Sequence, residues 1–144
     1  MSAVLLGPCL PGPPVLRPLL LSSVSAGFPS PADDYVEAQL DLNDHIGGSD
    51  PGTFFLRCSG DSMTGAGIYP GDLLVVRKGV EARSGDVVIA ELDGEFTVKR
   101  WLRRGGRAWL MPDSDRYDPI EVRPGHEMVV WGVVSHSLRM HREL

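Results

Sequence analysis

The stretch that decides the fold spans residues 86–102 and reads DVVIAELDGEFTVKRWL. Two runs of β-branched, aliphatic and aromatic residues, 86–92 and 95–102, flank the dipeptide Asp93-Gly94. An Asp-Gly pair between two such runs is the strongest short-range signal for a β-hairpin, because a tight hairpin turn needs residues that tolerate a positive φ. The stretch therefore predicts two antiparallel strands joined by a two-residue turn.

Four further runs of the same kind lie on both sides of this hairpin. Turn sequences that contain glycine separate them, among them Ser84-Gly85 and Gly105-Gly106. The runs are TFFLRC (53–58), DLLVV (72–76), RAWLM (107–111) and EMVVWGVVSH (127–136). Short strands at this spacing predict a mainly β domain with a mostly antiparallel sheet over residues 53–144.

Composition limits the classes of function. The chain has 144 residues, 42% hydrophobic and 23% charged, with a net charge of −5. These values fit a single globular domain and disfavour binding to duplex DNA by neutralisation of phosphates. Its two cysteines, Cys9 and Cys58, form no CxxC pair, its four histidines lack metal-ligand spacing, and no apolar run is long enough for a bilayer. We expect a cytoplasmic protein that uses neither a metal nor another cofactor.

The N-terminal third has a different composition. Residues 1–26 contain five prolines and a single charge, Arg17, so we expect an extended arm that forms no helix and no central strand. Residues 27–52 carry six acidic side chains and no lysine or arginine, which is typical of a solvated linker. Within this linker, residues 33–42 could form one short helix. The sequence thus predicts an arm (1–26), an acidic linker (27–52) and a β-rich domain (53–144).

Ser62 is the first candidate for chemistry. It lies in the segment SGDSM (59–63), directly after a predicted strand and on a turn that contains glycine. Such a turn can expose a hydroxyl and bring backbone N–H groups near it, which are the requirements of a nucleophile with an oxyanion hole. A serine at a turn also serves simply as a helix cap, so the position alone does not establish catalysis.

Lys99 is the second candidate. Strand alternation places Glu95, Thr97, Lys99 and Trp101 on one face of the predicted strand 95–102. Thr97 and Trp101 could partly bury the lysine, and burial lowers a lysine pKa by up to about 3–5 units. A neutral lysine can take the proton from a serine hydroxyl, as in Ser-Lys variants of the catalytic triad. A lysine on a solvated strand face is the alternative interpretation.

Residues 59–100 resemble the LexA/UmuD family of self-cleaving serine peptidases. The segment reads SGDSMTGAGIYPGDLLVVRKGVEARSGDVVIAELDGEFTVKR, and its motifs at 59–63, 70–73, 84–90 and 94–99 match in order. The resemblance implies a compact curled antiparallel sheet with a flexible N-terminal arm. It also implies that Ser62 is the nucleophile and Lys99 the general base, with backbone N–H groups at Asp61 and Ser62 holding the oxyanion.

Residues 26–36, AGFPSPADDYV, resemble the UmuD branch of the family, which cuts itself before a Gly-Phe-Pro-Ser-Pro segment. The resemblance places the scissile bond between Ala26 and Gly27. Members of the UmuD branch often have cysteine before this bond, whereas Ala-Gly is the LexA pattern. Both residues are small, and a glycine after the bond lets the chain approach a crowded site closely. Residues 1–25 match nothing in the family.

The resemblance implies a role in the response to DNA damage (SOS). A RecA–single-stranded DNA filament would stimulate cleavage in the bacterial cytoplasm. The trimmed product would form a homodimer that serves as accessory subunit of a UmuC-like Y-family translesion DNA polymerase. The main alternative is a LexA-like autocleaving repressor, but 26 residues with five prolines are too few for a helix-turn-helix domain before the bond. An interaction module with an inactive site is the second alternative.

Four other features have competing interpretations. Residues 24–26 (Val-Ser-Ala) resemble a signal-peptidase site, although the segment before them lacks a basic region. The arginines of the segment 100–107 could bind a nucleic acid, but a solvated hairpin tip explains them as well. Asp113 and Asp115 could ligate a metal or could simply form a turn. Cys58 is expected to be a core residue.

Overall fold

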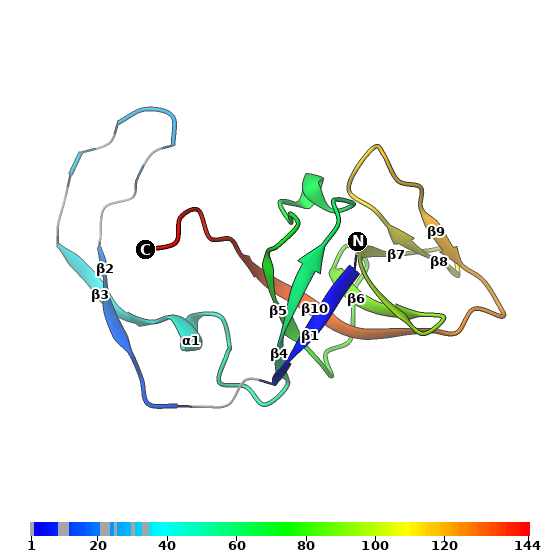
Figure 1. The fold of residues 1–144 in the computed structure, drawn as a ribbon, viewed down its shortest axis with the longest axis horizontal. Coiled ribbons are helices and arrows are strands. Elements are labelled where there is room, and N and C mark those ends of the chain that lie inside the picture. Colours follow the sequence, from blue (N-terminus) through cyan, green and yellow to red (C-terminus); the bar gives the residue numbers. More distant parts are fainter. Residues whose placement is uncertain (1, 9–11, 21–23, 25, 30, 33–34) are drawn as a thin grey trace.

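The computed structural model describes residues 2–8, 12–20, 24, 26–29, 31–32 and 35–144. These residues form two antiparallel sheets, one large and one small, which lie at opposite sides of the molecule (Figure 1). Among them, no helix is both long enough and apolar enough to cross a bilayer. The mainly β, antiparallel fold predicted from the sequence is confirmed.

The large sheet has the strand order β1-β4-β5-β10-β6-β7-β8-β9. Its strands are β1 (Ser2–Pro8), β4 (Thr53–Ser59), β5 (Leu73–Arg77), β6 (Val87–Leu92), β7 (Glu95–Arg104), β8 (Arg107–Met111), β9 (Ile120–Val122) and β10 (Met128–Leu138). Six of them coincide with the six runs singled out in the sequence, with ends that differ by at most two residues. The short strand β9 and the edge strand β1 were not predicted.

The hairpin of β6 and β7 forms as predicted. Leu92 pairs with Glu95, so Asp93 and Gly94 are the two turn residues. Both have positive φ, 50° for Asp93 and 84° for Gly94, as a tight turn that matches the strand twist requires. The turn fixes the register of β7, and this register places Lys99 opposite Val88.

The large sheet curls on itself. β1 pairs with β4 at one end of the strand order, yet it also lies beside β7, which is near the other end. β10 bridges β5 and β6 and has a register shift in each pairing, at Val130/Gly132 and at Val134/His136. Such shifts increase local twist and let a sheet bend, which is how this one brings β4 and β7 to the same side.

The small sheet consists of β2 (Leu16–Leu20) and β3 (Val36–Asp41), followed by α1 (Leu42–His45). A helix over residues 33–42 was expected, and that prediction was wrong for the described part of this range. Residues 36–41 are extended because they pair with β2, and this cross-strand pairing outweighs a weak helical pattern. Residues 33 and 34 lie outside the described residues. Asp41 caps α1 by accepting from the backbone N–H of Asn43.

Two apolar clusters form the core, and β6 contributes to both. Ile89 belongs to the first cluster and Val88 and Ala90 to the second, so both faces of the strand are covered. Met63 and Ile68, from the loop that follows β4, are buried in the first cluster. The core therefore anchors this loop at two positions, Met63 and Ile68.

Replacement of Gly94 by alanine tests the hairpin turn. Nothing lies within 4 Å of the position of an added Cβ, so the cost comes only from the positive φ. We expect Gly94→Ala to lower the free energy of unfolding by about 1 kcal/mol. Urea denaturation measures this loss of stability. Gly12→Ala is the control, because Gly12 also has open space around it but no positive φ. Equal stability of the two variants would contradict the assigned turn.

Candidate active site

Ser62 lies on the loop that follows β4. The strand ends at Ser59, Gly60 has a φ of 80°, and the chain then passes Ser62 before the short 3-10 helix η1 (Thr64–Ala66). The Ser62 side chain is fully buried, and its neighbour Met63 is packed in the core. The loop is therefore a fixed part of the structure that points a hydroxyl inward.

Lys99 enters the site from the middle of β7. Its relative exposure is only 5%, so of the two interpretations that the sequence left open, the buried lysine is the correct one. On its own face it lies beside Trp101, and across the ladder it faces Val88; both are buried and apolar. Desolvation by this environment disfavours the ammonium and lowers the pKa of Lys99 below its ordinary value of 10.5.

The structure brings Ser62 and Lys99 together. Lys99 Nζ lies 3.1 Å from Ser62 Oγ, 2.9 Å from Thr97 Oγ1 and 3.2 Å from the Val98 carbonyl oxygen. A neutral amine has two N–H donors and one lone pair. If Thr97 and Val98 accept the two N–H groups, the lone pair faces Ser62 and can accept the hydroxyl proton. Thr97 thus orients the amine. Strand alternation placed Thr97 on the same face as Lys99 but did not predict this hydrogen bond.

The loop between β8 and β9 contacts the loop of residues 60–72, which is called the nucleophile loop here after its candidate residue Ser62. The Asp113 backbone N–H donates to the Ser62 carbonyl oxygen at 2.8 Å, and the Asp113 carbonyl accepts from the Gly65 N–H at 2.8 Å. A Cβ at Gly65 would meet the Asp113 side chain, so glycine is required for this close approach. The Asp113 carboxylate is paired with Arg100 at 3.1 Å. Sequence reasoning missed this contact because it joins two loops through backbone atoms.

Asp61 is held by the same loop. Its carboxylate accepts from the Tyr117 hydroxyl and pairs with Arg116 at 2.7 Å. The Tyr117 hydrogen bond is the main reason that the pKa of Asp61 lies below its ordinary value, and a hydrogen bond from its own backbone N–H adds to this effect. The oxyanion role of the Asp61 and Ser62 N–H groups stays a prediction.

Asp72, the last residue of the nucleophile loop before β5, forms an ion pair with Arg139. Asp72 is 2% exposed and accepts from the Arg139 guanidinium twice, at 3.0 Å each, and from the Tyr69 N–H at 2.9 Å. The Arg139 hydrogen bonds hold the pKa of Asp72 below its ordinary value. Arg139 also donates to the Gly67 carbonyl oxygen and stacks 3.9 Å above the Tyr69 ring. These contacts connect the C-terminal end of the chain to the loop that carries Ser62.

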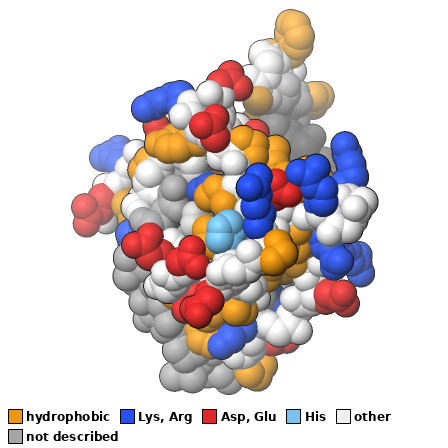
Figure 2. All heavy atoms as spheres, turned by 90° about the vertical axis from the view of Figure 1, so that its right-hand side faces the viewer, with side chains coloured by type: hydrophobic (Ala, Val, Ile, Leu, Met, Phe, Trp, Pro, Cys, Tyr) orange, Lys and Arg blue, Asp and Glu red, His pale blue; other side chains and the backbone are white. Residues whose placement is uncertain are grey.

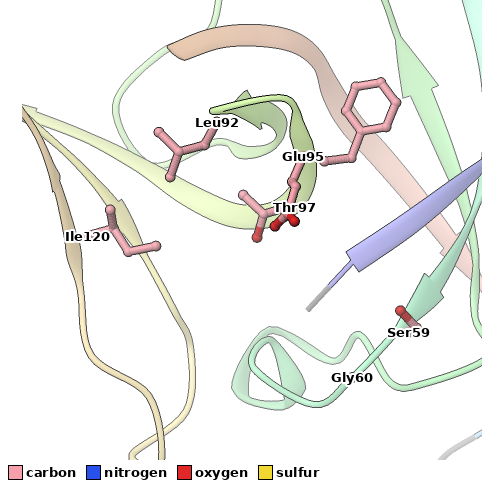
Figure 3. Close-up of a pocket in the computed structure, with 7 residues that line it drawn as sticks. Ser59, Gly60, Leu92, Glu95, Thr97 and Ile120 are labelled. Carbon is pink, nitrogen blue, oxygen red and sulfur yellow. The ribbon is translucent and has the colours of Figure 1, made fainter. Parts of the chain in front are cut away.

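A pocket opens beside the serine and the lysine. It lies between the end of β4, which contributes Ser59 and Gly60, and the start of β7, which contributes Glu95 and Thr97 (Figure 3). Its other lining residues are Leu92, Phe96 and Ile120. Thr97, which lines the pocket, accepts a hydrogen bond from Lys99, so the pocket adjoins the site.

The predicted scissile bond is not at the site. Ala26 and Gly27 are exposed and lie in the connection between β2 and β3, at the side of the molecule opposite β6–β9 (Figure 1). Nothing lies within 4 Å of the position of a Cβ at Gly27. The structure therefore brings together Ser62 and Lys99 but leaves Ala26 and Gly27 apart from them. Ser25, part of the signal-peptidase pattern at 24–26, lies outside the described residues.

The competing features have structural explanations of their own. Arg107 pairs with Glu121 at 2.8 Å and stacks over Trp109, while Arg103 and Arg104 are exposed at a hairpin tip. On the face that Figure 2 shows, basic side chains gather along the right-hand side with acidic side chains beside them, and further acidic side chains gather on the left. Among the described residues, no group of acidic, histidine and cysteine side chains has the arrangement of a metal site.

Cys58 lies in the first core cluster at 2% exposure, as expected. Burial raises the pKa of its thiol to about 11, so at neutral pH the sulfur is a protonated thiol. Cys58 is therefore not a rival nucleophile to Ser62. Cys9 lies outside the described residues.

Comparison with known proteins agrees with this geometry. The S24-like peptidase model matches residues 18–135. Protein ImpA of Salmonella typhimurium is 49% identical over 129 residues, which cover 90% of this chain and 88% of ImpA. Protein MucA of the same species is 43% identical over 125 residues, with 86% and 85% covered. The chain belongs to the S24-like peptidase family.

The LexA repressor of Acidothermus cellulolyticus is 41% identical over 128 residues, which cover 88% of this chain but only 45% of that repressor. The resemblance to the LexA/UmuD family inferred from the motifs is thus confirmed, and with it the assignment as a serine peptidase. In this S24-like peptidase, the matched region includes the nucleophile loop, β7 and the loop 112–119 between β8 and β9.

Removal of the Arg139 guanidinium tests the support of the nucleophile loop. We expect Arg139→Met to lower the free energy of unfolding at pH 7 by about 2 kcal/mol, because it leaves a buried carboxylate with fewer donors. The pKa of Asp72 is lowered in the folded state, so this stabilisation exists above its ordinary value of 3.8 and is lost as the pH falls through the folded pKa.

Urea denaturation at pH 7 and in acid measures the effect. The difference between the wild type and Arg139→Met should shrink in acid. Arg142→Met is the matched control, since Arg142 is exposed and lies three residues later. A loss of stability as large in the Arg142 variant, or one independent of pH, would refute the role of the buried pair.

Proposed function

We propose that this S24-like peptidase cleaves its own chain between Ala26 and Gly27, with Ser62 as nucleophile and Lys99 as general base. The contact of 3.1 Å between Lys99 Nζ and Ser62 Oγ, in a buried environment that favours the neutral amine, carries the proposal. A serine hydroxyl is a weak nucleophile by itself and needs such a base within hydrogen-bond reach.

The reaction has two halves. Lys99 Nζ takes the Ser62 proton while Oγ bonds to the Ala26 carbonyl carbon, and backbone N–H groups at Asp61 and Ser62 hold the resulting oxyanion. The C–N bond then breaks, and the ammonium of Lys99 returns the proton to the amine of Gly27. An ester between Ser62 and Ala26 remains. Water, deprotonated by Lys99, hydrolyses it and regenerates the hydroxyl.

Cleavage requires the segment around Ala26 to leave its resting position. This segment belongs to the connection of the two-stranded sheet β2–β3, which is separate from the large sheet. An isolated two-stranded hairpin is marginally stable in water, so its displacement costs little. Once docked, the tethered bond reacts without a bimolecular encounter, which can lower a barrier by roughly 7–11 kcal/mol at best.

In the cell, we place this cleavage in the response to DNA damage. A RecA–single-stranded DNA filament would favour the docked arrangement, and the trimmed homodimer would serve a UmuC-like Y-family polymerase. The similarity to ImpA and MucA over most of both chains supports this role over that of a LexA-like repressor, because the similarity covers less than half of the LexA chain.

The first experiment follows self-cleavage of the purified chain by intact-protein mass spectrometry from neutral to alkaline pH. We expect a product that begins at Gly27 and has 144 − 26 = 118 residues. Only the neutral amine of Lys99 acts as a base, so the rate should rise with pH. Because the folded pKa of Lys99 is lowered, the rate should level off below pH 10.5.

Ser62→Ala and Lys99→Ala should both leave the chain uncleaved at every pH, since each removes one half of the pair. Circular dichroism checks that both variants fold. A new N-terminus other than Gly27 would refute the cleavage site, and cleavage of Lys99→Ala at the wild-type rate would refute the proposed base.

The second experiment adds RecA, single-stranded DNA and a nucleotide at neutral pH. A filament that binds the docked arrangement more tightly raises its population, so the product that begins at Gly27 should appear well above the spontaneous rate. The same mixture without DNA is the control. Equal rates in the two mixtures would argue for a constitutive self-processing peptidase instead of a damage-response protein.

A further inference from the structure

The groove beside the serine and the lysine is already occupied by a strand of the same chain. β1 pairs antiparallel with the edge of β4, with Ser2 opposite Ser59 and Val4 opposite Arg57. It also lies beside β7. The strand therefore fills the gap between the two elements that carry the catalytic residues, and its first residue lies at the end nearest to them.

The ladder of β4 shows which backbone groups β1 uses. The Cys58 N–H donates to the Asp72 carbonyl oxygen, and the Cys58 carbonyl accepts from the Gly71 N–H, so both groups point toward β5. Backbone groups of successive residues in a strand point to opposite edges. Those of Arg57 and Ser59 therefore point toward β1, and Val4 and Arg57 form a hydrogen-bonded pair.

The same edge of β4 leads to the loop that carries Ser62. Figure 3 shows the start of β1 between Ser59 on one side and Thr97 on the other, at the pocket that adjoins the site. An extended peptide commonly binds such an edge by adding a strand, with main-chain hydrogen bonds for affinity. A segment that approached Ser62 along this edge would occupy the space that β1 fills.

We propose that the edge of β4 opposite β5 is a docking site for one extended peptide strand, and that residues 2–8 occupy it in competition with the proposed scissile segment around Ala26. The proposal rests on the proposed self-cleavage and adds a regulatory contact to it. Residues 2–8 then inhibit the peptidase by holding its substrate groove, and the chain is cleavable only in the fraction of molecules whose groove they have left.

Weakening of β1 should therefore speed up self-cleavage. Val4→Pro removes the N–H that pairs with Arg57, and proline is poorly tolerated in a paired strand. We expect the rate of appearance of the product at Gly27 to rise about threefold to tenfold, as loss of one ladder hydrogen bond implies. Val15→Pro is the matched control, because Val15 is exposed and lies outside the strands; its rate should equal that of the wild type.

Hydrogen exchange in the uncleavable Ser62→Ala background tests the docking without any activity. The Arg57 amide, which faces β1, should be protected in the parent chain and lose protection when Val4→Pro is added. The Cys58 amide, which donates to Asp72, should keep its protection in both. The synthetic peptide MSAVLLGP (residues 1–8), added in excess, should restore protection of Arg57 and slow cleavage of Val4→Pro, whereas a scrambled peptide should do neither.

The outcomes separate the two proposals. Unchanged protection of Arg57 in Val4→Pro would overturn the docking of residues 2–8, whatever the cleavage rates. Lost protection with an unchanged cleavage rate would overturn the competition, because the groove would be open without effect. If the wild type and Val4→Pro both fail to cleave, the proposed self-cleavage fails, while the exchange data still decide whether the strand docks.

Discussion

The burial of one amine against one hydroxyl is the constraint on which the site depends. Lys99 lies among apolar side chains at 5% exposure, where a charged ammonium is costly. Of its three hydrogen-bond partners, Thr97 and Val98 can accept the two N–H groups of a neutral amine, which leaves the lone pair facing Ser62. The environment thus keeps the amine poised to accept a proton. The register of β7, set by the turn at Gly94, brings the lysine to this position.

The serine is held with equal firmness, but by contacts of a different kind. The Asp113 backbone donates to the Ser62 carbonyl oxygen and accepts from the Gly65 N–H. The ion pair of the buried Asp72 with Arg139 holds the end of the same loop that precedes β5. Ala26 and Gly27, between which we propose the cut, are exposed in the connection between β2 and β3, outside the large sheet. Under the proposed self-cleavage, a buried pair held by the core and an exposed segment apart from it make cleavage depend on the fraction of molecules in which the two meet.

Much of this was predictable from local patterns. The Asp93-Gly94 turn predicted the hairpin, and the alternation of residues 95–102 raised the burial of Lys99 as one of two interpretations, because both features depend on near neighbours in sequence. Short-range reasoning failed where distant pairing decides the outcome. Residues 36–41 became a strand only because β2 lies beside them, and the contact of Asp113 with the nucleophile loop uses backbone atoms that carry no signal in the sequence.

The most direct test of the account is the titration of Lys99 itself. The chain has only two lysines, Lys78 and Lys99, so isotope-labelled lysine gives two side-chain resonances, and Lys99→Ala assigns them. In the folded Ser62→Ala variant, which stays intact, the account predicts that the Lys99 amine loses its proton below pH 10.5. A Lys99 resonance that titrates at or above that pH would contradict it, because the lysine would then remain an ammonium where the base is needed.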